Sequence, residues 1–483
     1  MNINGNIISK SQSICPVCHK PVEAFYVERD GKVYFEKYCR KHGLCSTVAA
    51  ENAEDYRQWI TNPVINIPPE KPLTKGDRKD KSCPLHCGTC QNHLQTACCV
   101  LIDITDRCNQ RCPYCFASAD KGPASADGLY PGEPTLAEME KKFDLLLDLG
   151  EERHFNIQLS GGEPTVRDDL PEIIKLARSK GFEYIQINSN GRRLAEEEGY
   201  ARVLKEAGAS VIFMQFDGTD DEIYIKLRNE PLLEKKIQAI RNCEAAGLAV
   251  TLVPTIVKGV NDHNVGEMMD FLLENVNVVK GIHFQPVSFF GRHPEEGTDR
   301  ALSGDFAGRI TMFELLRELE RQRPEFKYED FCPIATGHTL CCFYSTYIKE
   351  PDGSSKCTLT RERREAGIAC CDISQVDKGD VIRKDRDFVL NKWEILSPEE
   401  LQAQADARSA QGAPTYRSSS EITSMDEFLH YFRQNIFTVT GMGFMDITNL
   451  DAERVKRCRV QQLTSDNKLI PFCAYNSIYR PAE

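Results

Sequence analysis

The sequence has no long apolar run, no excess of basic residues and only two tryptophans. Because no apolar stretch approaches the roughly 18 residues that cross a bilayer, we expect no transmembrane segment. The first residues, Met1 to Asn6, lack the basic and apolar regions of a secretory signal peptide, so the expected location is the cytoplasm. The formal net charge of −12 argues against general binding to the phosphate backbone of nucleic acids.

Cysteine, by contrast, is abundant: the 483 residues include 21. In a cytosolic chain such cysteines are more often reduced metal ligands than disulfides. The chain is too long for one ordinary core, and its composition changes several times. We expect a metal module at 1–62, a linker rich in proline and charge at 63–82, a second cysteine segment at 83–99, a domain of alternating strands and helices at 100–300, and a C-terminal region at 301–483.

The first module holds two arms of metal-ligand spacing. Cys15 and Cys18 form one arm, and Cys39 with either Cys45 or His42 forms the other. Two such arms joined by a hairpin are typical of a tetrahedral thiolate site. The set Cys15, Cys18, Cys39 and Cys45 would be rubredoxin-like, whereas His42 would give three sulfurs and one nitrogen. The spacing does not choose between iron and zinc.

The second cysteine segment offers four thiolates close together, from Cys83, Cys87, Cys90 and Cys98. Four ligands would complete a 4Fe–4S cluster and leave no iron open. Such an auxiliary cluster would relay electrons or anchor a substrate, and the alternative is a structural zinc ion. The neighbouring Cys99 is expected to pack into the strand that follows, and Cys243 to pack on a helix face in the core.

Residues 100–300 alternate between strand-like and helix-like patterns, which predicts a parallel sheet. Six such units predict an incomplete (β/α)6 barrel of the TIM type, whose site lies at the carboxyl ends of the strands. The expected strands are Val100–Ile104, Phe155–Leu159, Tyr184–Ile187, Val211–Phe216, Ala249–Pro254 and Ile282–Gln285, and the expected helices include Leu136–Leu149, Leu170–Lys180, Leu194–Ala207 and Val265–Asn275. Beyond the barrel, Met425–Ile436 is expected to be an amphipathic helix and 402–420 to be exposed.

Directly after the first of these strands, Cys108, Cys112 and Cys115 supply three thiolates from one short loop. Three ligands to a four-iron cluster leave one iron open to chelate a small molecule. After the second strand comes a turn with Gly161, Gly162 and Glu163, in which adjacent glycines let the backbone approach a ligand. A zinc knuckle or a redox-sensing loop is the alternative for the cysteines, and an ordinary turn for the glycines.

The order and separation of these two motifs resemble radical S-adenosylmethionine (SAM) enzymes. The resemblance implies that Cys108, Cys112 and Cys115 hold a 4Fe–4S cluster whose open iron binds SAM, and that the cluster reduces SAM to a 5′-deoxyadenosyl radical. It also implies that the turn with Glu163 receives the SAM ammonium. Further expected SAM contacts are Tyr114, Gly161, Gly162, Asn188, Gln215, Asp217 and Gln285, most of which follow or end predicted strands.

Taken over nearly the whole chain, the cysteine pattern is similar to an archaeal radical SAM family that contains tetraether lipid synthase and dihydropterin methyltransferases. The resemblance implies a partial barrel, a rubredoxin-like iron and auxiliary 4Fe–4S clusters. Among the dispersed C-terminal cysteines, Cys341, Cys458 and Cys473 are the candidate ligands of a third cluster. The family pattern expects a cysteine where this chain has Thr336, and Cys332 or Cys342 could substitute. Our first hypothesis is coupling of isoprenoid lipid chains by C–C bond formation, with peripheral contact at the inner face of the membrane.

Two alternatives stay open. The first is C-methylation of a dihydropterin, which predicts a short polar pocket with aromatic stacking in place of a long apolar groove. The second is an electron-transfer protein with several clusters and no SAM chemistry. Each reading includes a low-potential partner such as ferredoxin or flavodoxin as electron donor.

Overall fold

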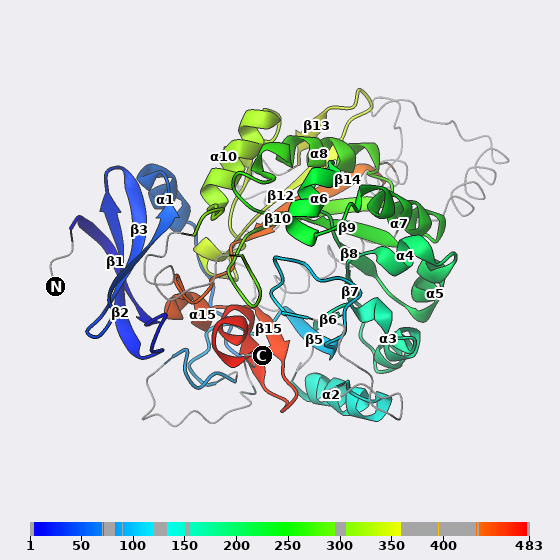
Figure 1. Ribbon diagram of the computed structural model, residues 1–483, viewed down its shortest axis with the longest axis horizontal. Helices are drawn as coiled ribbons and strands as arrows, with labels where there is room; N and C mark the ends of the chain where they lie inside the picture. The colour runs from blue at the N-terminus through cyan, green and yellow to red at the C-terminus, as the bar shows by residue number, and fades with distance from the viewer. Residues whose placement is uncertain are drawn as a thin grey trace.

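The computed structural model describes residues 4–69, 71, 83–88, 90–119, 133–149, 155–294, 306–358, 395, 431 and 434–480. They form two sheets. A small antiparallel sheet contains the N-terminal residues, and a large twisted sheet, covered by helices on its outer side, contains the rest (Figure 1).

The small sheet consists of two hairpins. Its strands, in spatial and chain order, are β1 (Asn6–Ile14), β2 (Pro21–Arg29), β3 (Lys32–Cys39) and β4 (Gly43–Ala50). Asp30 and Gly31 join β2 to β3 with positive φ angles of 52° and 75°, the backbone form that two-residue hairpin turns require. Helix α1 (Ala53–Ile60) follows, and its first turn is capped by the Asn52 side chain, which accepts from the N–H groups of Glu54 and Asp55.

The centre of the large sheet is the predicted six-stranded parallel half-barrel. Neighbouring strands pair in parallel in chain order, and the layer of helices lies outside them (Figure 1). The strands are β5 (Cys99–Thr105), β6 (Asn156–Gly161), β7 (Ile185–Ser189), β8 (Val211–Gln215), β9 (Ala249–Val253) and β11 (Val279–Pro286), and the helices are α2 (Leu136–Leu149), α3 (Leu170–Ser179), α4 (Arg192–Glu196), α5 (Tyr200–Ala207), α6 (Asp221–Arg228), α7 (Leu233–Ala245) and α8 (Val265–Glu274).

One predicted helix is wrong in detail. The stretch 194–207 is not one continuous helix, because Gly199, with a φ angle of +78°, separates α4 from α5. The apolar positions continue with helical spacing across this glycine, so the pattern alone hid the break. The buried positions of Cys99, at the start of β5, and of Cys243, within α7, agree with the prediction for both cysteines.

The C-terminal residues extend the same sheet at both edges. Beyond β11 lie β14 (Ile436–Met442), which is parallel to it, and then β12 (Cys342–Lys349) and β13 (Ser355–Cys357). Beyond β5 lie β15 (Val460–Leu463), also parallel, and β16 (Leu469–Pro471). Short elements complete the described chain: β10 (Thr255–Ile256), η1 (Pro164–Val166), η2 (Asp262–Asn264), α10 (Met312–Gln322), η3 (Tyr328–Asp330), η4 (Thr339–Cys341), α15 (Ala452–Lys456), α16 (Phe472–Ala474) and η6 (Tyr475–Tyr479).

Alternate residues along each central strand face opposite sides of the sheet. Ile157, Ile212 and Ile282 are fully buried in the core cluster that also contains the helix residues. The residues between them, such as Phe213 and His283, point to the inner side and keep part of their surface exposed. The inner side is therefore the one on which a bound molecule can contact the strands.

The segment 402–420 and most of the helix expected over 425–436 lie outside the described residues, but Tyr431, Gln434 and Asn435 are described and helical, as predicted. The last residue of that helix, Ile436, begins β14 instead. Within the described part of the chain, no helix combines the length and apolar character needed to cross a membrane.

The small sheet is joined to the large one by buried polar contacts. The Tyr26 hydroxyl donates to a carboxylate oxygen of Asp451 at 2.8 Å. The indole Nε1 of Trp59, in α1, donates to the Thr339 carbonyl at 2.7 Å, and its ring meets the edge of Phe313 with centroids 5.7 Å apart. Trp59 is 4% exposed, so it links α1 to two separate C-terminal segments from a buried position.

We expect Trp59→Phe to lower the free energy of unfolding by ~1 kcal/mol, because the ring is kept while the hydrogen bond to Thr339 is lost. Trp59→Ala should cost about 3–5 kcal/mol, because it also leaves a cavity between α1 and α10. Thermal unfolding of the three proteins checks this order. Equal midpoints for the Phe and Ala variants would contradict it.

Candidate metal centres and active site

Four side chains of the small sheet converge as a mononuclear metal site requires. The donor atoms of Cys15, Cys18, Cys39 and His42 all lie within 4.8 Å of one another, and the Cys15 Sγ is 3.3 Å from the His42 Nδ1. This spacing fits a tetrahedral ion with bonds of roughly 2.0–2.3 Å to nitrogen and sulfur. Although burial opposes it, hydrogen bonds from the backbone N–H groups of Lys41 and His42 lower the pKa of Cys39 to about 6, which favours its thiolate.

The predicted fourth ligand, Cys45, is not in this group, and His42 takes its place. Cys45 is 2% exposed, and its thiol lies 3.7 Å from the Thr448 carbonyl oxygen, to which it donates. Burial raises the pKa of this thiol, so Cys45 packs against the C-terminal region as a neutral side chain.

The three clustered cysteines of the barrel lie on the loop that leaves β5. The N–H of Gln110 donates to the Cys108 sulfur at 3.4 Å. Arg292, which follows β11, pairs with Cys115 through backbone hydrogen bonds of 2.9 and 3.0 Å and donates from its side chain to the Cys112 carbonyl at 2.8 Å. The loop is thus held at the point where the first and sixth barrel strands end.

A buried ion pair supports the same loop from a third direction. The Arg228 guanidinium makes two hydrogen bonds to Asp217, of 2.6 and 2.8 Å, and donates to the Tyr114 carbonyl at 3.0 Å. Arg228 also faces Cys112, where its charge acts to lower the thiol pKa against the larger effect of burial. A fixed cation beside the cysteines stabilises thiolates and suits a cluster whose sulfurs carry negative charge.

The two adjacent glycines allow the second loop to lie directly on the first. The Gly162 N–H donates to the Thr105 carbonyl and the Glu163 N–H to the Arg107 carbonyl, both at 2.8 Å. A Cβ at Gly161, which has φ +136°, would come within 2.1 Å of the Thr105 oxygen, and one at Gly162 within 2.2 Å of the Arg107 oxygen. Only glycine fits at either position.

Glu163 joins the ends of β6 and β7. Its carboxylate accepts from the hydroxyls of Thr165 and Ser189, at 2.6 and 2.8 Å, and from the N–H of Asn190 at 2.6 Å. Burial raises its pKa, and these hydrogen bonds oppose the rise. The structure therefore shows a positioning role within the protein, and the contact with the SAM ammonium stays a prediction.

The other predicted SAM contacts lie at the same edge of the sheet, on or just after strand ends. Asn188 donates to Gln158 and accepts from Gln186. Gln215 donates to Asp217 and accepts from Lys236 at 2.7 Å. Gln285 pairs with Thr255 of β10, and Tyr114 lies within the cysteine loop, partly buried against the apolar residues around Val287. The fold brings these residues to one edge, and their contacts with SAM stay predictions.

Sequence reasoning missed the basic residues that hold this edge together. Arg228 and Lys236 lie on helices α6 and α7, where a basic residue usually faces solvent, and Arg292 lies in the loop after β11. Lys236 is instead 1% exposed and donates to the Asn190 carbonyl and to Gln215, and burial lowers its pKa to about 7. No local pattern distinguishes these residues from surface charges.

In the second cysteine segment, a hydrogen bond between the Cys83 and Cys87 side chains lowers the pKa of Cys83 and raises the pKa of Cys87, and Cys90 is close enough to act on Cys87. The Tyr479 hydroxyl accepts from the N–H groups of His86 and Cys87, at 2.8 and 2.9 Å, and donates to the Pro84 carbonyl. The predicted fourth member, Cys98, donates to the Arg459 carbonyl at 3.5 Å. A residue near the C-terminus thus holds this loop, and no sequence signal indicated it.

The three dispersed cysteines proposed for a third cluster gather around one arginine. Arg454 donates to the Cys341 sulfur at 3.5 Å and also faces Cys473. Cys473 is buried and Cys458 is partly buried. Burial, followed by the neighbouring Cys473, raises the pKa of Cys458, and burial raises the pKa of Cys473 to about 12. Among the described residues, the only set whose donor atoms lie close enough together to bind a single ion is Cys15, Cys18, Cys39 and His42. Ligands on separate irons of one cluster lie farther apart, so this finding does not decide about the other sets.

The remaining cysteines have separate surroundings. Thr336, where the resemblance expected cysteine, accepts a hydrogen bond from Arg459. Cys332 pairs with Tyr344 through backbone hydrogen bonds, and Cys342 begins β12 in a buried position. Cys370 and Cys371 lie outside the described residues.

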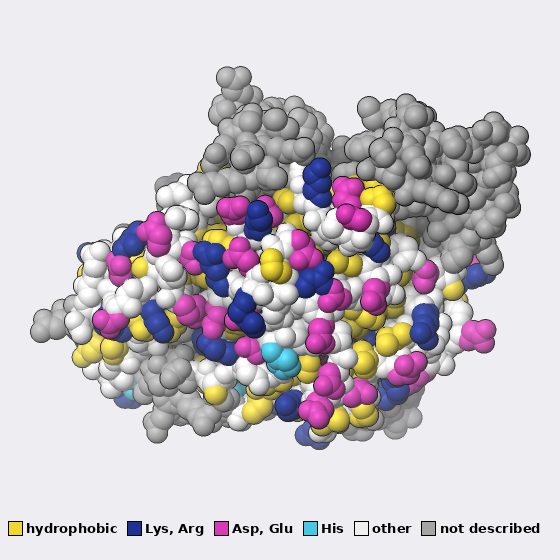
Figure 2. Space-filling model, turned by 90° about the horizontal axis from the view of Figure 1, so that it is seen from above, with side chains coloured by type: hydrophobic (Ala, Val, Ile, Leu, Met, Phe, Trp, Pro, Cys, Tyr) yellow, Lys and Arg dark blue, Asp and Glu magenta, His cyan; other side chains and the backbone are white. Residues whose placement is uncertain are grey.

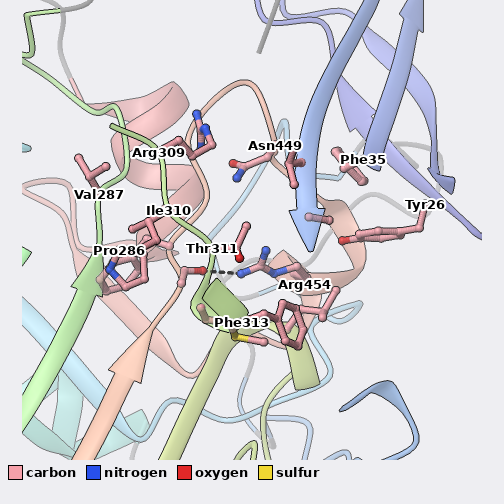
Figure 3. Close-up of a pocket in the computed structure, with 16 residues that line it drawn as sticks. Tyr26, Phe35, Pro286, Val287, Arg309, Ile310, Thr311, Phe313, Asn449 and Arg454 are labelled. Atoms are coloured by element: carbon pink, nitrogen blue, oxygen red, sulfur yellow. Dashed lines mark hydrogen bonds between the residues drawn. The ribbon is translucent and has the colours of Figure 1, made fainter. Parts of the chain in front are cut away.

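A small cavity of about 70 Å³ separates the small sheet from the end of β11. Figure 3 shows Tyr26 and Phe35 on the side of the small sheet, Arg309 and Asn449 at the upper rim, and Arg454 donating to the Gly443 carbonyl. The Arg309 Nε and the Asn449 Oδ1 are buried there without a partner among the described residues. This volume suits a few water molecules and is too small for a bicyclic ring.

Acidic and basic side chains are interspersed on the face that Figure 2 shows, and neither sign forms a broad patch among the coloured residues. The net charge of −12 is therefore not concentrated on the visible part of this face. The arrangement gives no footprint for a phosphate backbone on that part of the surface.

Comparisons with known proteins agree with this geometry. The profile of the Radical SAM superfamily matches residues 102–272, and that of the HMPTM N-terminal zinc ribbon domain matches residues 7–51. The 7,8-dihydro-6-hydroxymethylpterin dimethyltransferase of Methanocaldococcus jannaschii is 33% identical over 499 residues, which cover 98% of this chain and 94% of that protein. A probable GTP 3′,8-cyclase of Methanothermobacter thermautotrophicus is 36% identical over 180 residues, which cover 37% of this chain and 55% of that protein. Among solved structures, Streptococcus suis SuiB bound to precursor peptide SuiA has a TM-score of 0.37 at 14% identity and covers 49% of this chain and 47% of its own.

The fold, the cysteine loop and the first profile together define a radical SAM protein, a class that carries a 4Fe–4S cluster and uses SAM. Within that class, the chain belongs to the family of the M. jannaschii dimethyltransferase, because the two proteins align along nearly their whole lengths. The N-terminal sheet is accordingly a zinc ribbon, which is one of the two kinds of module that the ligand spacing left open.

We expect His42→Ala to lose the ribbon's metal, because three thiolates then remain to hold the ion. Cys45→Ser should keep about one zinc per chain, since its sulfur points elsewhere. Metal analysis of the purified proteins, with iron measured in parallel, separates this site from the iron–sulfur clusters. Loss of zinc in Cys45→Ser with retention in His42→Ala would contradict the assignment.

We expect Gly162→Ala to destabilise the protein by about 1–3 kcal/mol, because the new methyl group overlaps the Arg107 carbonyl. The displaced loop should also weaken the change that SAM causes in the electron paramagnetic resonance (EPR) signal of the reduced cluster. Gly337→Ala is the matched control, since its Cβ would meet the Ile334 carbonyl at an ordinary 3.7 Å. Equal behaviour of the two variants would refute the explanation.

Proposed function

We propose that this protein transfers methyl groups to a 7,8-dihydropterin by radical SAM chemistry. The observation that carries the proposal is the match to the M. jannaschii dimethyltransferase, which covers 98% of this chain. The GTP 3′,8-cyclase, by contrast, matches little more than a third of this chain.

Lipid coupling, our first hypothesis from the sequence, is not supported. The relative that aligns over 98% of the chain is named for a pterin substrate, which favours the alternative. We expected peripheral membrane contact because of the lipid substrate, so this expectation is no longer supported either. The electron-carrier reading loses support as well, because the chain belongs to a family of SAM-dependent transferases.

In this proposal, Cys108, Cys112 and Cys115 hold the cluster, which when bound supplies the electron that cleaves SAM to a 5′-deoxyadenosyl radical. Arg228 and Arg292 fix the loop that carries these cysteines. The Gly161–Glu163 turn brings backbone polar groups close to the open side of the loop, where the ammonium and carboxylate of SAM require partners. Asn188, Gln215 and Gln285 are the proposed polar contacts to the rest of SAM.

The remaining cysteines have supporting roles in this proposal. Cys83, Cys87, Cys90 and Cys98 hold an auxiliary cluster, and Cys341, Cys458 and Cys473 supply ligands to another. The zinc of the ribbon is structural, since zinc does not change its oxidation state. Ferredoxin or flavodoxin is the proposed electron donor.

The test is anaerobic incubation of the reconstituted full chain with SAM, a strong reductant and 6-hydroxymethyl-7,8-dihydropterin. We expect pterin products heavier by one or two methyl groups and 5′-deoxyadenosine formation that the pterin stimulates. Cys115→Ser should abolish both, because one of three cluster ligands is removed.

An archaeal diether lipid supplied instead of the pterin serves as the matched substrate control. Consumption of the lipid with no change in the pterin would overturn the proposal. Turnover that survives the Cys115→Ser substitution would overturn the assignment of the cluster loop.

A further inference from the structure

The inner side of the half-barrel carries polar and aromatic residues, of which Phe213 and His283 have no role in the proposed function. Strand register places Asn188, Phe213 and Thr251 side by side on neighbouring strands. The β11 residue in register with Thr251 is Gly281, and His283, two positions further along the same face, is paired with Thr440 of β14. Helices cover the opposite side of these strands, so this side is the one available to a substrate (Figure 1).

The hydrogen bonds around His283 fix the position of its proton. The Thr440 hydroxyl donates its only hydrogen to the Ile282 carbonyl, at 3.2 Å, so its oxygen must accept from the His283 Nδ1, at 2.9 Å. Desolvation lowers the pKa of His283 to about 4, and the ring is therefore neutral at physiological pH. A neutral ring protonated on Nδ1 leaves Nε2 as a hydrogen-bond acceptor, and no described residue bonds to it.

An aromatic face lies beside this acceptor. The Phe213 and His283 ring centroids are 5.2 Å apart at an interplanar angle of 47°. Both rings stay partly exposed, although the core residues on either side of them in each strand are buried. On the neighbouring strands β7 and β6, Gln186 donates to Asn188 at 2.8 Å, and Asn188 in turn donates to Gln158. These three amides thus support one another and hold the neighbouring part of the surface in place.

A free acceptor next to an aromatic ring recognises a particular chemistry. It suits a planar heterocycle that stacks on the ring and presents an N–H donor at its edge. The pyrimidine ring of a pterin has such donors, whereas an isoprenoid chain has none and would leave the imidazole nitrogen desolvated without a partner.

We propose that His283 and Phe213 form the substrate-recognition surface of this enzyme, with the His283 Nε2 accepting an N–H of the heterocycle and Phe213 packing against its face. This inference rests on the proposed function, since it assigns residues to the same pterin. It makes His283 a specificity-determining residue that is distinct from the cluster and SAM contacts.

The experiment measures binding of 6-hydroxymethyl-7,8-dihydropterin to the reconstituted full chain by anaerobic titration calorimetry. His283→Phe, which keeps a ring but removes the acceptor, should weaken binding about 10-fold to 100-fold. His283→Gln should retain most of the affinity, because its amide oxygen can replace Nε2. Phe213→Leu should weaken binding about 3-fold to 10-fold through loss of the aromatic face.

His263→Gln is the matched control. Because His263 is exposed in η2, this variant should bind the pterin as tightly as the unmodified protein does. The EPR change that SAM causes should be the same in all variants, which also establishes that they fold. Unchanged pterin affinity in both His283→Phe and Phe213→Leu would overturn the inference, as would equal losses in His283→Gln and His283→Phe. If the unmodified protein itself neither binds nor methylates the pterin, the proposed function fails instead.

Discussion

The arrangement of the site depends on one buried ion pair. Asp217 follows β8 and Arg228 ends α6, and neither is more than 8% exposed as a side chain. Because an unpaired charge at this depth would be very costly, each residue confines the other to one position. The guanidinium still has a donor left for the Tyr114 carbonyl, and the carboxylate also accepts the N–H of Thr255. Through these bonds the pair ties the fourth and fifth strand ends to the cysteine loop after the first.

The sheet is built so that distant segments meet at this edge. The loops after β5 and β6 are in backbone contact because of two glycines, while the cysteine loop also pairs with residues that follow β11. The C-terminal strands β14 and β15 extend the half-barrel at its two edges and bring Cys341, Cys458 and Cys473 together. The half-barrel thus collects the loops after its strands at one edge, whereas these three cysteines flank the strands that the C-terminal residues add to the sheet.

What the sequence could predict depended on how far apart the interacting residues lie. The six strands and the spacing of Cys108, Cys112 and Cys115 are local patterns, so they were recognised. The contacts of Arg292 with Cys112 and of Arg228 with Tyr114 span 180 and 114 positions, and only the fold reveals them. The choice of His42 over Cys45 depends on which side of β4 faces the C-terminal region, which spacing within the arm does not encode.

Tyr479 has a consequence for how the protein matures. Its hydroxyl fixes the loop of Cys83 and Cys87 through contacts that span up to 395 positions. During synthesis, those cysteines leave the ribosome long before the tyrosine that orders them. A cluster delivered to the nascent chain would meet an unsupported loop. Under the proposal that this segment holds an auxiliary cluster, insertion of iron and sulfide there would follow the synthesis of Tyr479 and the folding of the C-terminal residues onto the loop.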